Sequence, residues 1–194
     1  MSETRSRILD AARELFMRNG LEALSMRRVA ERSQLTVSAL YRHFEDKDAL
    51  LAALLESSFG AFAGTLMRAL DAPTPLAQFR AMLERYFDFA LDHPQDYALM
   101  FLLNTRDQGF EKLGSQTQAL LGSSFKFMAE RIEDCIEAGV FAAGDPEAKA
   151  TLVWAELHGL VSLYTRGQLG AVSAKQFRAS ASESIELLVR ALRA

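Results

Sequence analysis

The chain has 194 residues, of which 49% are hydrophobic and 9% aromatic, which is enough for one or two compact domains with a substantial core. Its single cysteine, Cys135, excludes an internal disulfide framework, and its three scattered histidines form no metal-ligand pattern. No long apolar stretch lacks charge and no apolar signal core opens the chain, so we expect a cytoplasmic protein without a membrane span.

The formal net charge of −3 is unevenly distributed. Residues 1–47 carry nine Lys and Arg against seven Asp and Glu, whereas residues 48–194 carry thirteen against eighteen. A mildly basic N-terminal segment followed by an acidic body is weak support for nucleic acid binding at the N-terminal segment.

The first predicted element is an amphipathic helix over residues 4–18. Ile8, Ala12, Leu15 and Phe16 lie at positions i, i+4, i+7 and i+8, which places them on one helical face. The pair Asn19-Gly20 predicts the end of this helix, because both residue types tolerate the left-handed backbone conformation.

Two short helices and a turn follow. Ser25 is placed to cap a helix over 26–33, and Thr36 is placed to cap another over 36–44. The few residues around Gln34 and Leu35 join them, so the segment is a candidate helix-turn-helix.

The rest of the chain also predicts helices. Asp46 is placed to cap a long helix over about 47–70, and residues 104–114 are the best candidate for a loop. The later helices are predicted over about 75–91, 95–103, 115–138, 146–166 and 173–192. We therefore predict an all-α protein of about nine helices, with an N-terminal domain over 1–47 and a C-terminal domain over 48–194.

The third helix has an outward face that suits DNA. Leu40 and Phe44 share one side and would bury the helix, which leaves Ser38, Ala39, Tyr41 and Arg42 facing outward. Small residues early in the helix and the lack of acids would allow close approach to a major groove. An ordinary helical hairpin within a bundle shows a similar pattern, so spacing alone leaves DNA binding open.

Further residues extend this face. Arg42 can pair with guanine or phosphate, while Tyr41 and His43 can donate hydrogen bonds to phosphate oxygens. Arg27 points outward from the second helix, and Lys47 lies in the first turn of the fourth helix, where the helix end also favours an anion.

Residues 8–54 strongly resemble the N-terminal domain of TetR-family transcriptional regulators. The matching features are the I-x-x-A-A-x-x-L-F helix, the N-G stop, the pair Val29-Ala30 and the L-Y-R-H-F-x-x-K-x-x-L run from Leu40 to Leu50. The resemblance implies a homodimeric repressor whose two N-terminal domains enter successive major grooves of an operator, and which leaves the DNA when a small molecule binds its body. It places the DNA-contacting residues at Thr36, Tyr41, His43 and Lys47 for phosphate, and at Arg27, Val37, Ser38 and Arg42 for bases.

Two positions depart from the family pattern. The family usually has Gly in the turn, where this chain has Gln34, and a non-Gly residue with positive φ costs about 1 kcal/mol there. The family often has Lys or Arg where this chain has Val37, which can contact only a thymine methyl. These differences concern the operator sequence rather than the DNA-binding role.

The C-terminal half resembles one class of C-terminal domain in the same family, through HPQDYALMF at 93–101 and the W-H-G residues Trp154, His158 and Gly159. This resemblance implies a ligand cavity in the body and a four-helix dimer interface made by the last two helices of each subunit. The apolar stripe of Ile185, Leu188, Val189 and Leu192 on the last helix is one that a partner subunit could cover.

Aromatic and methionine side chains outside the N-terminal domain are candidates to line that cavity. Such side chains make adaptable walls for lipophilic ligands, although most are expected to be plain core. Few charges fall among them, so an apolar effector is favoured. The predicted ligand-binding residues are Phe62, Phe87, Tyr97, Met100, Phe101, Phe125, Met128, Trp154 and His158, and Phe59 and Met67 belong to the same class.

A helical enzyme or small-molecule binder without DNA is the rival hypothesis. The chain contains no G-x-S-x-G, P-loop or G-x-G-x-x-G motif, so we predict neither an enzyme nor a cofactor. The cationic and hydrogen-bonding residues around the third helix have no role in such a rival, and this favours a DNA-binding regulator.

Overall fold

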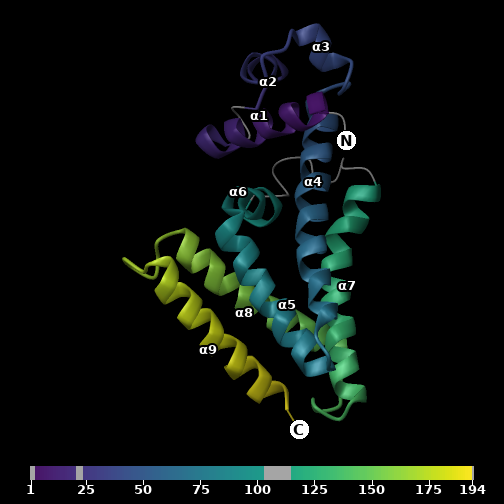
Figure 1. The fold of residues 1–194 in the computed structure, drawn as a ribbon, viewed down its shortest axis with the longest axis vertical. Coiled ribbons are helices and arrows are strands. Elements are labelled where there is room, and N and C mark those ends of the chain that lie inside the picture. The colour runs from purple at the N-terminus through teal and green to yellow at the C-terminus, as the bar shows by residue number, and fades with distance from the viewer. Residues whose placement is uncertain (1–2, 21–23, 103–114, 194) are drawn as a thin grey trace. The chain divides into compact units, whose positions relative to one another are not determined.

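The structure is a computed structural model that describes residues 3–20, 24–102 and 115–193 (Figure 1). In these ranges it contains nine α-helices, two short helical turns of other kinds and no strand, which confirms the predicted all-α class. The predicted loop at 104–114 lies outside the described residues.

The first helices begin where their capping residues predict, but the third, expected to reach residue 44, ends as α-helix at Tyr41. Gly20 has a φ of +71° after the first helix, and the Ser25 hydroxyl accepts a hydrogen bond of 3.3 Å from the backbone N–H of Arg28. The Thr36 hydroxyl accepts from Ala39 N–H at 3.1 Å, and the Asp46 carboxylate accepts from Ala49 N–H at 2.7 Å. These helices are α1 (Glu3–Asn19), α2 (Met26–Arg32), α3 (Val37–Tyr41) and α4 (Lys47–Met67).

Two predicted helices change character near their ends. The helix expected to reach residue 70 ends as α-helix at Met67 and continues as the 3-10 turn η2 (Arg68–Asp71). The helix expected over 95–103 is α6 (Pro94–Tyr97) followed by the π-helical turn η3 (Ala98–Leu102). The remaining helices are α5 (Pro75–Asp92), α7 (Ser115–Glu137), α8 (Pro146–Thr165) and α9 (Ala174–Leu192).

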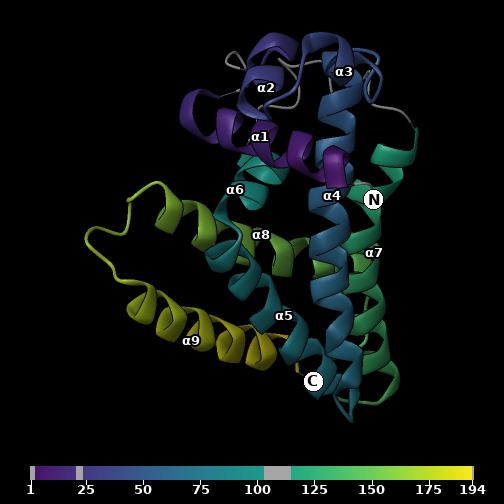
Figure 2. The ribbon, with the colours of Figure 1, turned by 45° about the horizontal axis from the view of Figure 1, so that its top comes forward.

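The chain divides into two compact units. The first comprises Met1–Gly60 and Gln95–Ala119, and the second comprises Ala61–Pro94 and Leu120–Ala194. In the first unit α1 packs on α2 and α2 packs on α3, as Figures 1 and 2 both show. The core of this unit is apolar and includes Ile8, Leu9, Ala12, Phe16, Leu24, Val29, Leu40, Phe44, Leu50, Leu54, Tyr97 and Leu99.

The second unit is organised around α5, which packs against both α8 and α9 (Figure 2). Its core is held by pairs of aromatic rings in edge contact. The Phe62 ring lies 5.5 Å from that of Tyr86 and 5.0 Å from that of Phe89, and the Phe87 ring lies 5.8 Å from that of Phe177. Such contacts add to the stabilisation that area burial gives each ring.

The apolar stretch Lys47–Asp71 is long and apolar enough to span a membrane by length and composition, with a mean hydropathy of 1.5 over its most apolar window. Half of that window is buried inside the protein, and a core helix passes the same test of length and composition.

Candidate nucleic-acid interface and ligand site

The short helix α3 presents an exposed polar face. Leu40 and Phe44 are buried as predicted, and their burial fixes which side of the helix faces outward. The last turn is tighter than expected, because the N–H groups of His43 and Phe44 both donate to the Leu40 carbonyl, at 2.9 and 3.1 Å. The exposed side chains of this face are Thr36, Val37, Ser38, Tyr41, Arg42 and His43.

Two cationic residues on neighbouring helices complete the predicted DNA-binding set. Arg27 is exposed on α2, where Met26, Val29 and Ala30 point into the core. Lys47 is the first residue of α4 and is half-buried. All eight predicted DNA-binding residues therefore belong to the first compact unit, on α2, on α3 and the residues that flank it, and at the start of α4.

The turn between α2 and α3 has the left-handed backbone conformation that a glycine would favour. Gln34 has a φ of +57°, and it is the one non-glycine residue in the described ranges with positive φ. The turn is held from α1, because the Arg7 guanidinium donates a hydrogen bond of 2.8 Å to the Ser33 carbonyl. An ion pair between Arg32 of α2 and Glu14 of α1 adds a second tie.

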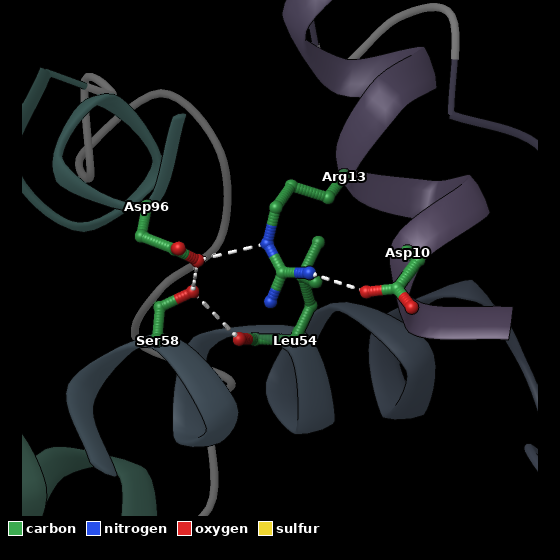
Figure 3. A network of polar contacts seen from close by, with 5 residues as sticks. All are labelled: Asp10, Arg13, Leu54, Ser58 and Asp96. Carbon is green, nitrogen blue, oxygen red and sulfur yellow. Dashed lines mark hydrogen bonds and ion pairs between the residues drawn. The ribbon is translucent and has the colours of Figure 1, made fainter. Parts of the chain in front are cut away.

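A buried polar network joins α1, α4 and α6 in the same unit (Figure 3). The Asp96 carboxylate accepts hydrogen bonds from Arg13 Nε at 2.8 Å and from the Ser58 hydroxyl at 2.5 Å. None of these residues is among those predicted from the sequence to have a role. The available signal was one acid within the otherwise apolar run HPQDYALMF, and nothing in the sequence indicated its partner 83 positions upstream.

The predicted ligand-binding residues do not form a single cluster. Tyr97, Met100 and Phe101 belong to the first unit, where the Phe101 ring lies 5.0 Å from that of Tyr97 and 5.9 Å from that of Phe59. The others belong to the second unit. Five of the nine are buried in the core, namely Phe62, Phe87, Tyr97, Met100 and Met128.

Trp154 and His158 are neighbours on α8, as their spacing predicts, with ring centroids 5.8 Å apart. The Trp154 ring also lies 6.2 Å from that of Phe125, yet 39% of Trp154 is exposed, so this tryptophan is not a core residue of the isolated chain. Burial lowers the pKa of His158, and the positive charge of Arg166 lowers it further, so this imidazole is neutral at pH 7.

A groove in the second unit lies between the end of α4 and α7, with a volume of about 220 Å³. The Ser124 hydroxyl in its wall is buried without a hydrogen-bond partner among the described residues. Met67 lines this groove and belongs to the class of side chains that the sequence favours for a cavity wall. The other lining residues are Ala63, Leu66, Ser123, Lys126, Phe127 and Glu130.

Helices α8 and α9 lie side by side and expose several large apolar side chains. Leu152 is 69% exposed and Leu187 is 54% exposed, and Leu163 is also exposed. The stripe that the sequence suggested for a partner subunit is instead largely covered within the chain, because Ile185 and Val189 are buried in the unit in which α9 packs on α5. A partner on α8 and α9 would therefore contact a different set of residues.

The single cysteine is buried on α7. Burial raises the pKa of the Cys135 thiol to about 11, and the Asp134 carboxylate adds to the rise, so the thiolate that metal binding and redox chemistry need is absent at pH 7. Among the described residues no group of three or more His, Cys, Asp or Glu side chains could hold a metal ion.

Comparison with known proteins gives two family matches. The family model described as "Bacterial regulatory proteins, tetR family" matches residues 8–54, and the family model "Tetracyclin repressor-like, C-terminal domain" matches residues 79–192. The second match alone spans more than half of the chain.

Individual relatives are similar over part of their length. The HTH-type transcriptional activator FasR of Mycolicibacterium smegmatis is 34% identical over 100 residues, which is 51% of this chain and 46% of FasR. The repressor KstR of the same species is 40% identical over 82 residues, which is 42% of this chain and 40% of KstR. The matched stretches thus cover less than half of these curated relatives.

The fold recurs over whole chains among solved structures. The TetR-family regulator PfmR of Thermus thermophilus has a TM-score of 0.78, covers 95% of this chain and 97% of its own, and is 22% identical in sequence. At this level of identity the similarity shows the fold. The named relatives are transcriptional regulators and not enzymes.

Proposed function

The chain belongs to the tetR family of bacterial regulatory proteins, and from this membership we propose that it is a DNA-binding transcriptional regulator whose operator affinity is controlled by a small molecule. The functional division that we propose is a DNA-binding domain over residues 1–47 and a ligand-binding and dimerisation domain over residues 48–194. A cytoplasmic location follows from this role, because the operator is there.

The observation that carries the proposal is the exposed face of α3. Its core-facing residues are buried and its outward residues are small, aromatic or cationic, with no acid between Thr36 and Phe44. A surface helix without a DNA role would usually carry Glu and Lys on such a face. A helix that lies in a major groove needs small residues for close approach and cationic residues for phosphates and bases.

Each residue of the face has a proposed role. Tyr41, His43, Thr36 and Lys47 hold the domain on phosphates and so set its register, which carries no sequence information. Arg42 and Ser38 face base edges, as does Val37, whose methyl groups suit a thymine methyl. Arg27 contributes from α2.

We propose that α8 and α9 form the homodimer interface. The exposed side chains of Leu152, Leu163 and Leu187, together with the exposed part of Trp154, give these two adjacent helices an apolar surface that a second copy would cover. Two-fold symmetry then matches a pseudo-palindromic operator, whose half-sites lie about 34–36 Å apart.

We propose that the effector is largely apolar and that its binding releases the protein from DNA. The protein would then act as a repressor. The predicted ligand-binding residues are aromatic rings and methionines with few charges among them, which suits an apolar molecule. KstR, with 40% identity over its matched stretch, is named a repressor. An effector must bind the off-DNA form more tightly than the DNA-bound form to cause release.

The test begins with selection of duplexes from random DNA by the full-length protein. Binding of the selected duplex is then titrated at several salt concentrations for the wild type, for Lys47→Ala and for Lys126→Ala. Lys47→Ala should weaken binding to every sequence and reduce the slope of log K against log salt by about 1 per subunit. Lys126 lies exposed on α7, outside the DNA-contacting face and the proposed dimer interface, and serves as a matched control with unchanged affinity and slope.

Failure of the wild type to enrich any duplex would remove the proposed function. Equal slopes for the wild type and Lys47→Ala would remove the assignment of this lysine to phosphate. A selected duplex upstream of a gene whose transcription rises with added protein would identify an activator, the role named for FasR, instead of a repressor.

A further inference from the structure

We propose that the largely buried ion pair between Arg13 and Asp96 is a positioning element for operator binding: it fixes the direction of α1, the helix against which α2 packs and, through α2, the DNA-binding helix α3. This inference rests on the proposed DNA-binding function and assigns a role to two residues outside the DNA-contacting face.

The geometry of the pair is well defined (Figure 3). Arg13 Nε donates to Asp96 Oδ1 at 2.8 Å, and the two side chains are only 19% and 12% exposed. The Ser58 hydroxyl, which projects from α4, donates to the same oxygen at 2.5 Å. The other end of the guanidinium donates to Asp10 at 2.8 Å, and that carboxylate is 63% exposed. Three helices distant in sequence thus meet at one carboxylate oxygen.

A buried ion pair restricts how the helices that carry it are arranged more than it stabilises the folded state. The loss of hydration when both charges are buried offsets most of their attraction, so the net contribution to stability is small. An arrangement of α1 that separates Arg13 from Asp96 would lose this contact between two largely buried charges, and removing one partner of such a pair is unfavourable. The pair therefore favours the observed direction of α1 relative to α4 and α6.

The orientation of α1 determines the orientation of the DNA-binding helices. Helix α1 packs on α2, and α2 packs on α3. Arg7 of α1 holds the Ser33 carbonyl in the turn that leads into α3, and Glu14 of α1 pairs with Arg32 of α2. A rotation of α1 would consequently move α3 with it.

The pair is also adjacent to candidate effector contacts. Ser58 is followed in the sequence by Phe59, and Asp96 is followed by Tyr97. Both rings contact the Phe101 ring, at 5.9 and 5.0 Å between centroids. The ion pair therefore lies next to aromatic side chains that the sequence makes candidates for effector binding.

The experiment measures the affinity of the full-length dimer for two probes: the duplex selected by the wild type and a duplex that contains one of its half-sites. Binding to the complete site requires both DNA-binding domains to point correctly at once, whereas a half-site accepts one domain in any direction. Asp96→Asn keeps the size of the side chain and removes the ion pair. It should weaken binding to the complete site about tenfold and leave half-site affinity unchanged.

Two further variants separate this role from a structural one. Asp10→Asn removes the exposed contact of the same guanidinium and should leave both affinities as in the wild type. The double variant carries both Arg13→Gln and Asp96→Asn. Its affinity for the complete site should be no lower than that of the single variant that binds this site less tightly, because the two residues act as one unit.

Several outcomes would overturn the inference. These are an unchanged affinity of Asp96→Asn for the complete site, an equal fall on both probes, or the same loss in Asp10→Asn. If Asp96→Asn does not fold, Arg13→Gln, which removes the same ion pair from the other side, carries the same expectation at the complete site, and wild-type behaviour of that variant would contradict the inference. Failure of the wild type to bind either probe would instead contradict the proposed function.

Discussion

The Arg7 guanidinium of α1 donates a 2.8 Å hydrogen bond to the carbonyl of Ser33, the residue directly before the left-handed Gln34. The strained turn of the helix-turn-helix is therefore held in place by a helix outside the motif. This arrangement explains how a non-glycine residue is tolerated at a position with positive φ, because the surrounding contacts determine the backbone conformation.

Gln34→Gly should stabilise the protein. Glycine adopts a φ of +57° without the clash between Cβ and backbone, and this gain exceeds its greater entropy in the unfolded chain, so we expect about 0.5–1 kcal/mol of added stability. Urea unfolding followed by circular dichroism would measure it. Gln34→Ala keeps a Cβ and should show no comparable gain; a glycine variant no more stable than the alanine variant would contradict the strain.

Arg42→Ala should change sequence preference rather than affinity for DNA in general. Its guanidinium is exposed on the face of α3 and is proposed to pair with a base edge, worth about 1–3 kcal/mol of discrimination at one base pair. Selection from random DNA with Arg42→Ala should give a site that is degenerate at one position in each half-site. An unchanged selected site would place Arg42 on phosphate.

Leu187→Glu should disrupt the homodimer. Leu187 is 54% exposed on α9 beside α8, and a carboxylate there would have to be buried without a partner in the proposed interface. Sedimentation analysis should detect monomers at micromolar concentration, with loss of binding to the complete operator. Leu70→Glu is the matched control, because Leu70 is 41% exposed on η2 and outside the proposed interface, and that variant should remain dimeric. A dimeric Leu187→Glu would exclude the α8–α9 interface at this position.

His158 should make stability sensitive to mild acid. Its folded-state pKa is lowered by burial and by Arg166, whereas in the unfolded chain it returns to about 6.5. As the pH falls below 6.5 the unfolded chain binds a proton that the folded protein resists, so the free energy of unfolding falls until the folded-state pKa is passed. NMR titration of the imidazole should give a midpoint below 6.5, and Arg166→Gln should raise that midpoint. His158→Gln should lessen the acid sensitivity, and an unchanged pH profile would contradict this assignment.

Most of the fold could be predicted because the residues that begin and end its helices are local signals in the sequence. Ser25, Thr36 and Asp46 cap the helices that their positions predict, and Gly20 has the positive φ expected at the end of the first helix. The π-helical turn at Ala98–Leu102 could not be predicted, because such turns depend on packing rather than on a residue signature.

The candidate site was predictable only where one helix face decides it. The outward face of α3 follows from the burial of Leu40 and Phe44, and the structure places these residues in the core. Trp154 could not be assigned in this way, because the sequence pattern of an apolar residue on an apolar helix is the same whether the residue faces the core or an exposed surface. The pairing of Arg13 with Asp96 depends on a long-range contact that no local pattern records.

Helix α3 has only five residues, too few to form in isolation, so its shape is imposed by the Thr36 cap and by the anchoring of Leu40 and Phe44. The residues between these anchors contribute little to folding. Substitutions there are consequently almost free of structural cost, and a duplicated gene can acquire a new target sequence in a few mutational steps while its product continues to fold.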